Sequence, residues 1–219
     1  MKEKGKRLLI LGGIFIVGFT LWTLLIQAVD VSPTGVNGTD IGFSTINNWF
    51  HKLTGVHMSL YVITDWLGLV PIFVCMVFGF IGLIQLIKRR SLFKVDYDII
   101  FLGIYYVIVI FGYLIFEMVP INYRPVLING ILEASYPSST TMLVMCVMPT
   151  AIMHFNCRIK NCLLNRCVIF AIVAFIAFMV IGRLVSGVHW ITDIIGGALF
   201  STAIVLMYYA ICNIVTKNR

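Results

Sequence analysis

The chain has 219 residues, of which 60% are hydrophobic and only 11% are charged, and its formal net charge is +7. Soluble domains are about 45–50% apolar and about 25% charged. The composition therefore excludes a soluble protein and predicts a single all-α integral membrane domain, 1–219. The basic residues flank the apolar runs, which favours a role in membrane topology over binding to nucleic acid.

Six apolar runs each approach or exceed the roughly 20 residues that a helix needs to cross a bilayer. In chain order, they predict helices at 8–29, 58–87, 99–119, 138–155, 167–185 and 188–214. We expect Pro71 to kink the second helix. Between the first two runs, Ile46, Trp49, Phe50 and Leu53 recur at helical spacing among polar residues. This pattern predicts a short amphipathic helix in the membrane interface.

The basic residues predict the orientation of this six-helix bundle. One side comprises the N-terminus, the loops 88–94 and 158–166, and the C-terminus with Lys217 and Arg219. That side holds 13 of the 16 lysines and arginines, and the other side keeps only Lys52, Arg124 and Arg183. By the positive-inside rule, both termini are cytoplasmic, N-in and C-in. We expect the protein to reside in the plasma membrane.

The junction between the last two runs gathers three charged or titratable side chains. The Ser186-Gly187 pair predicts a break that places Arg183 at the end of one helix and His189 at the start of the next. His189 and Asp193 are four residues apart, so on a helix they share one face. An imidazole backed by a carboxylate and facing a cation can attack a phosphorus atom. The plain alternative is a hydrogen-bonded histidine in a turn, although charged groups at membrane depth are usually functional.

Two further polar segments fall on the same, extracytoplasmic side in this topology. Arg124 is followed by a proline, and the planar fork of arginine suits a phosphate. Ser138 and Ser139 follow Pro137 and precede an apolar run, so they occupy a predicted helix N-terminus. Its free N–H groups can hold an anion, and the serines can equally act as N-caps.

These three segments resemble the type-2 phosphatidic acid phosphatase (lipid phosphatase/haloperoxidase) superfamily, in its membrane branch. The family motifs are K-x6-R-P, P-S-G-H and S-R-x5-H-x3-D, and the resemblance covers a core of about 97–214. It implies that His189 is the nucleophile that forms a phosphohistidine, that Asp193 orients it, and that Arg124 and Arg183 bind phosphate oxygens. It also implies a phosphorylated membrane lipid as substrate, and neither a metal ion nor another cofactor.

The first motif departs from the family at Glu117, where the pattern has lysine. A carboxylate about 4 Å from a phosphate charge costs about 4 kcal/mol at an effective dielectric of 20. We therefore expect Glu117 to be turned away, paired with Arg124 or Arg183, or protonated. Lys52, on the same outer side, is the candidate for supplying the missing cation.

The second motif departs at Thr140, where the family histidine protonates the leaving group. A threonine hydroxyl is a poor acid at neutral pH. A leaving group that is itself a phosphate needs much less help, because it departs as a stable anion. The sequence therefore favours lipid diphosphates, such as a polyprenyl diphosphate, over lipid monophosphates.

The sequence supports an extracytoplasmic lipid phosphatase or diphosphatase as the first interpretation. A related phosphotransferase, in which an alcohol accepts the phosphoryl group, differs only in its acceptor. A third interpretation is a catalytically silent member that binds anionic lipid head groups or serves as a structural partner. Two other acidic residues receive milder interpretations. Asp65 either lines the pocket or caps its helix, and the sequence favours capping. Glu133 borders the site, where it either helps to select the head group or belongs to a solvated loop.

Overall fold

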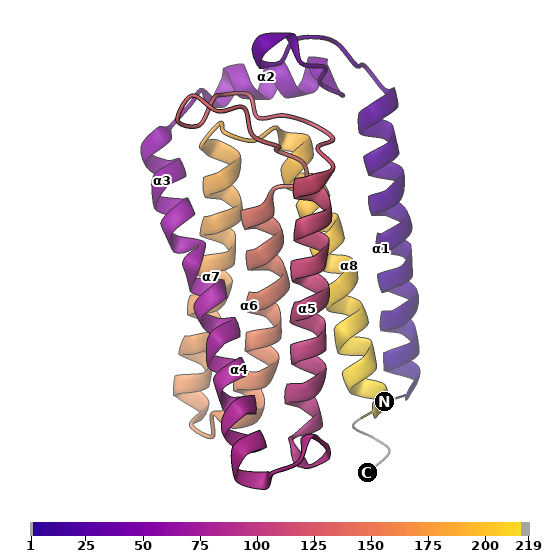
Figure 1. Ribbon diagram of the computed structural model, residues 1–219, viewed down its shortest axis with the longest axis vertical. Coiled ribbons are helices and arrows are strands. Elements are labelled where there is room, and N and C mark those ends of the chain that lie inside the picture. The colour runs from indigo at the N-terminus through magenta and orange to yellow at the C-terminus, as the bar shows by residue number, and fades with distance from the viewer. Residues whose placement is uncertain (1, 216–219) are drawn as a thin grey trace.

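The computed structural model describes residues 2–215, and its regular elements there are helices (Figure 1). The elements are α1 (Lys2–Ala28), η1 (Val36–Gly38), α2 (Ser44–Thr54), α3 (Met58–Leu67), α4 (Leu69–Arg89), η2 (Leu92–Lys94), α5 (Tyr97–Met118), α6 (Ser139–Arg158), α7 (Cys162–Val185) and α8 (Ile191–Val215). Among the described residues, six helical spans are long and apolar enough to cross a membrane, with α3 and α4 forming one span. The prediction of six spans is confirmed. Lys217 and Arg219, two of the expected cytoplasmic cations, lie outside the described residues.

Two of the differences from the predicted helix boundaries have identifiable local reasons. The second span breaks at Gly68 rather than at Pro71. Because proline cannot donate to the carbonyl four residues earlier and its ring clashes there, the helix breaks in the preceding turn, and Pro71 lies in the first turn of α4. The fifth span begins at Cys162, earlier than predicted. The side chain of Asn161 accepts a hydrogen bond from the Leu164 N–H at 3.1 Å and so caps this helix.

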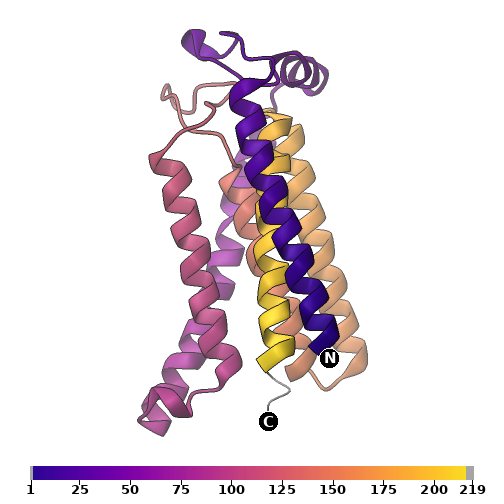
Figure 2. The ribbon, with the colours of Figure 1, turned by 90° about the vertical axis from the view of Figure 1, so that its right-hand side faces the viewer.

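α6 is the central helix of the bundle and packs against α4, α5, α7 and α8. α1 lies along the outer side of α8, as the turned view shows (Figure 2). Small residues allow these approaches. A side chain at Gly12 would meet Met207 Cγ at 2.8 Å, and the hydroxyl of Ser201 donates to the Met142 carbonyl at 3.1 Å. Gly197 and Ser201, four residues apart on α8, therefore form a small-residue face that contacts α6.

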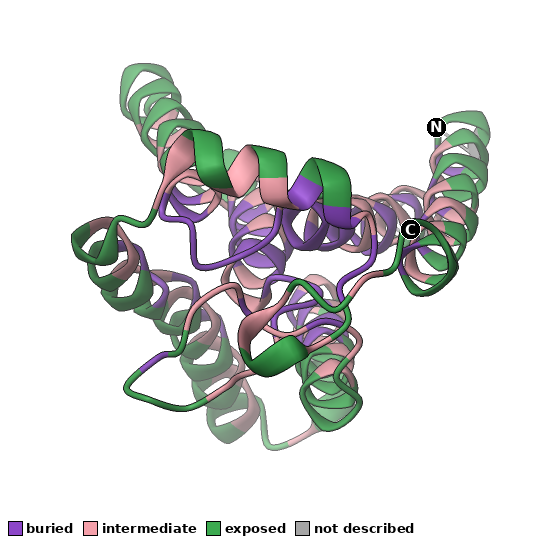
Figure 3. Ribbon diagram, turned by 90° about the horizontal axis from the view of Figure 1, so that it is seen from above, coloured by how far each residue is buried: buried purple, intermediate pink, exposed green. Residues whose placement is uncertain are grey.

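α2 lies across one end of the bundle, together with the loops that follow α5 and α7 (Figures 1 and 3). Its apolar residues Trp49 and Leu53 are exposed, while Asn47 is buried and donates to the Gly42 carbonyl at 2.8 Å and the Thr192 hydroxyl at 3.0 Å. One face of α2 thus packs against the bundle, and the other face presents apolar side chains outward. This arrangement is the one expected of an interfacial helix.

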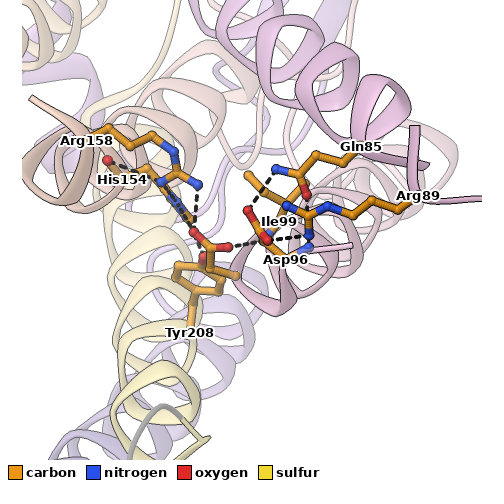
Figure 4. Close-up of polar contacts among 8 residues, drawn as sticks. Gln85, Arg89, Asp96, Ile99, His154, Arg158 and Tyr208 are labelled. Atoms are coloured by element: carbon orange, nitrogen blue, oxygen red, sulfur yellow. Dashed lines mark hydrogen bonds and ion pairs between the residues drawn. The ribbon is translucent and has the colours of Figure 1, made fainter. Parts of the chain in front are cut away.

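A polar cluster ties the helices together at the opposite end of the bundle (Figure 4). Asp98, in the first turn of α5, accepts from Arg158 Nη2 at 2.7 Å and lies 3.4 Å from Nδ1 of His154. The buried His154 in turn contacts the Tyr208 hydroxyl of α8 at 2.7 Å. One carboxylate therefore links α5 to α6 and, through His154, to α8. Nearby, Asp96 bonds with Gln85 and Arg89 at the end of α4.

We predict that Asp98→Asn destabilises the bundle, because it removes the charge that Arg158 and His154 share. Since Asp98 is partly exposed, the free energy of unfolding should fall by only about 1 kcal/mol. Denaturant unfolding in detergent measures this change. Glu3→Gln is the matched control, because the Glu3–Arg7 pair is highly exposed and its loss should leave unfolding unchanged. Equal effects of the two substitutions would contradict the role of the cluster.

Candidate active site

A cavity of about 280 Å³ opens at the end of the bundle that carries α2. It lies between α3, the end of α5, the loop 119–138, the start of α6 and the turn between α7 and α8. The side chains that line it include Tyr61, Asp65, Tyr113, Phe116, Glu117, Arg124, Glu133, Ser135, Ser139 and His189. Four of the predicted site residues, Glu117, Arg124, Ser139 and His189, are among them. Segments that are far apart in the sequence therefore meet in one pocket, as predicted.

The turn between α7 and α8 presents the histidine to this cavity. α7 ends at Val185, and the predicted break follows, with Gly187 at a φ of +69°. A side chain at Gly187 would meet the Gly55 carbonyl oxygen at 2.0 Å, so only glycine fits. The His57 N–H donates to the Ser186 carbonyl at 2.9 Å. The segment between α2 and α3 thus braces the turn from outside the bundle.

His189 is buried, with one ring nitrogen bonded to the protein. Its Nδ1 is 3.1 Å from the carbonyl oxygen of Ser135, and a carbonyl can only accept, so Nδ1 carries the proton. No partner for Nε2 is found among residues 2–215. Burial, and secondly the nearby charges of Arg124 and Arg183, hold the pKa of the imidazole well below its usual range. Nε2 is therefore an unprotonated nitrogen with a free lone pair.

The relation between His189 and Asp193 differs from the sequence expectation. His189 lies in the turn, two residues before α8, so the prediction that both residues share one helical face is wrong. The Asp193 carboxylate accepts from the Trp190 N–H at 2.9 Å and stands 3.7 Å from Nδ1 of His189. A carboxylate at the third position of a helix commonly accepts from the backbone N–H of the residue just before the helix. Asp193 thus fixes the start of α8, and the Ser135 carbonyl makes the shorter contact with the imidazole.

Arg183, in the last turn of α7, is buried and held by two side chains. Its Nη2 donates to Asp65 Oδ1 at 2.7 Å and to the hydroxyl of Thr140. Its guanidinium carbon also lies 4.9 Å from the centre of the Tyr61 ring. Thr140 therefore positions an arginine. Asp65 is an ion-pair partner that lines the cavity, so of its two expected roles the structure has pocket lining and not the favoured helix capping.

Arg124 also lies near Tyr61, and its guanidinium carbon is 5.8 Å from the centre of that ring. Its Nε is 3.1 Å from Glu133 Oε2, and its backbone N–H donates to the Glu133 carbonyl at 3.1 Å. Arg124 therefore pairs with Glu133 rather than with Glu117. Glu117 is exposed and lines the cavity.

Several buried polar atoms near this cavity lack a hydrogen-bond partner within the described part of the chain. Among them are Arg124 Nη1, Arg183 Nε and Nη1, Ser138 Oγ and His189 Nε2. Buried polar groups in folded proteins are nearly always hydrogen-bonded, and these two guanidinium groups keep donors without partners beyond their pairs with Glu133 and Asp65. Donors of this number and charge suit a tetrahedral oxyanion such as a phosphoryl group. His189, with its unpartnered Nε2, lines the same cavity.

Two of the predicted site residues occupy other positions. Lys52 is exposed on α2 and is not among the residues that line the cavity. The side chain of Ser138 makes no capping hydrogen bond to α6 within residues 2–215, and its backbone N–H donates to the Asp193 carbonyl at 3.1 Å. The start of α6 is therefore joined directly to the start of α8.

The sequence prediction missed Ser135, and it ranked pocket lining by Asp65 below helix capping. Ser135 is a small loop residue whose contribution is a backbone carbonyl, for which a sequence carries no signal. The position of Asp65 did carry a signal, because an acidic residue inside an apolar span usually has a functional partner.

Comparison with known proteins gives two matches. The family model described as "PAP2 superfamily" matches residues 102–217, which is more than half of the chain. The fold is similar to the crystal structure of a transmembrane PAP2-type phosphatidylglycerolphosphate phosphatase from Bacillus subtilis. That match has a TM-score of 0.65 and 15% sequence identity, and it covers 95% of this chain and 98% of the other. None of the curated proteins compared with this chain matches it.

We predict that His189 stays neutral at about pH 6, where an ordinary histidine, with a pKa of about 6.5, is largely protonated. Arg124→Gln should raise the pKa of His189, because it removes a nearby positive charge. Arg89→Gln, at the far end of the bundle, should leave it unchanged. NMR titration of 15N-labelled imidazole in detergent micelles measures both. A His189 that titrates at its ordinary pKa in the unsubstituted protein would contradict the proposed electrostatics.

Proposed function

Because the chain belongs to the PAP2 superfamily, we propose that it is a membrane lipid phosphatase that acts through a phosphohistidine at His189. The observation that carries the proposal is the neutral, buried imidazole, whose unpartnered Nε2 lies near two arginines that have unpartnered donors of their own. This combination supplies a nucleophile and a site for the charge of a phosphoryl group.

The first chemical step follows from the roles of these side chains. Nε2 attacks the phosphorus atom, and the bond from phosphorus to the leaving oxygen breaks. Arg124 and Arg183 hold the nonbridging oxygens, whose charge increases in the transition state. The Ser135 carbonyl, which accepts the hydrogen bond from Nδ1, stabilises the positive charge that forms on the ring.

The preferred substrate depends on whether the leaving group must be protonated as it departs. The hydroxyl of Thr140 accepts from Arg183, so it is engaged in positioning and supplies no acid. With a lipid monophosphate as substrate, the leaving group is an alkoxide that would have to depart unprotonated. With a lipid diphosphate, the leaving group is the lipid monophosphate, which is a stable anion. We therefore propose a preference for lipid diphosphates, including polyprenyl diphosphates, over lipid monophosphates.

The topology supports a site on the extracytoplasmic face of the plasma membrane. The cavity lies at the end of the bundle opposite the start of α1 and the segments 88–94 and 158–166, which together carry most of the described basic residues (Figure 1). By the positive-inside rule, that basic end faces the cytoplasm. The substrate phosphate would then enter the site from the outer leaflet.

Two alternatives share the fold and differ in chemistry. A phosphotransferase would pass the phosphoryl group from His189 to an alcohol, and product analysis with added alcohols distinguishes it from a hydrolase. A silent member would bind an anionic head group without turnover. The buried, uncharged His189 favours catalysis, because binding alone requires the arginines and gains nothing from a free nucleophilic nitrogen.

We predict that His189→Ala abolishes phosphate release and that Arg183→Ala lowers it by about 10²–10³-fold, the usual cost of losing a transition-state donor. Purified protein is assayed in detergent against a panel of lipid monophosphates and diphosphates. His57→Ala is the matched control, since His57 does not line the cavity, and it should retain full turnover. Unfolding midpoints of all variants should match the unsubstituted protein. Undiminished turnover in His189→Ala would exclude the proposed mechanism.

We also predict that Thr140→His extends activity toward monophosphates, because it adds a side chain able to protonate an alkoxide. The ratio of initial rates on a polyprenyl diphosphate and on phosphatidic acid measures this shift. The unsubstituted protein should strongly favour the diphosphate. Equal rates on both substrates in the unsubstituted protein, or an unchanged ratio in Thr140→His, would contradict the leaving-group argument.

A further inference from the structure

We propose that Asp65 is the general base that activates the water molecule for hydrolysis of the phosphohistidine, an inference that rests on the proposed function. Asp65 belongs to α3, a helix outside the three sequence motifs. It lies in the last turn of that helix, just before the break at Gly68. Its side chain lines the same cavity as His189.

The contacts of Asp65 place a free carboxylate oxygen beside the phosphoryl site. Oδ1 accepts from Arg183 Nη2 at 2.7 Å, while Nη1 of the same guanidinium has no partner among residues 2–215. A phosphoryl oxygen on Nη1 would therefore share one guanidinium with Asp65. No hydrogen bond to Oδ2 is found within the described chain, and the side chain is 57% exposed. Oδ2 is accessible to water at that position.

The charge state of Asp65 makes it suited to accept a proton and unsuited to donate one. Asp65 forms an ion pair with the Arg183 guanidinium at 2.7 Å, and its side chain is open to solvent. The site thus holds a base for the second step and no equivalent acid for the first. This asymmetry matches a substrate whose leaving group departs without protonation, as a diphosphate does.

The second step can be written with all atoms accounted for. Oδ2 of Asp65 takes a proton from water as the water oxygen bonds to phosphorus. The bond between phosphorus and His189 Nε2 breaks, and its electron pair returns to the ring. The products are inorganic phosphate, a neutral His189 and a protonated Asp65, which releases its proton to solvent through the cavity.

Glu133 is the other carboxylate paired with a site arginine, and it is the natural competitor for this role. It lies on the loop 119–138, its side chain is 38% exposed, and it contacts Nε of Arg124. Asp65 is the better base on two counts, because a helix holds it in place and its carboxylate is more open to water. The two residues therefore form a matched pair for experiment.

Rapid-quench kinetics with a polyprenyl diphosphate, labelled with 32P on its terminal phosphate, separates the two steps. Asp65→Asn keeps an oxygen that can accept from Arg183 and loses only the basic group. We expect one equivalent of lipid monophosphate to be released at nearly the normal rate. Label should then accumulate on His189, with dephosphorylation slowed by about 10²–10⁴-fold. Asp65→Glu, which retains a carboxylate, should dephosphorylate faster than Asp65→Asn.

Two controls separate base catalysis from the positioning of Arg183. Thr140→Val removes the other acceptor of Nη2 and should impair substrate binding or the first step without accumulation of label. Glu133→Gln should likewise accumulate none. The proposal is overturned if Asp65→Asn slows both steps equally or neither, or if only Glu133→Gln accumulates label. Absence of both phosphate release and His189 labelling in the unsubstituted protein would instead remove the proposed function itself.

Discussion

Two guanidinium groups buried near one histidine are the constraint on which this structure depends. Arg124 and Arg183 flank Tyr61, and both lower the pKa of His189. Cations cannot remain buried without compensating charge, and the fold provides one carboxylate for each, Glu133 for Arg124 and Asp65 for Arg183. These pairs leave other guanidinium nitrogens, including Nη1 of each arginine, without a hydrogen-bond partner in the described chain. The resting protein is thus close to charge balance while still able to accept an anion.

The helix ends hold these charges in place, and the turn before α8 is the point where they are joined. Trp190 donates from its indole N–H to the Tyr123 carbonyl at 2.8 Å, beside Arg124. Thr192 bonds with Asn47 of α2, and its carbonyl accepts from the Trp22 indole of α1. The backbone N–H of Ser138 bonds to Asp193. Four chain segments therefore fix the turn and helix start that follow His189.

Much of this architecture was predictable from the sequence, and the failures have physical causes. Apolar run length gave the six spans, and the polar segments around Arg124, Ser139 and His189 were expected to meet, as they do in the cavity. What failed depends on three-dimensional contacts. The spacing of His189 and Asp193 suggested a helix, whereas the N–H of Trp190 is capped by Asp193 and the helix begins after it. The partnership of Asp65 with Arg183 joins residues from different spans, which no local pattern encodes.

The close approach of Gly55 and Gly187 limits how this site can change over evolutionary time. A methyl group on Gly187 would overlap the Gly55 carbonyl, and both residues have positive φ angles. Gly187 cannot acquire a side chain without displacing the turn that presents His189, and a side chain at Gly55 would be strained by the positive φ. In related chains, these two positions are therefore expected to remain glycine together or to be replaced together, along with the length of the segment that joins α2 to α3.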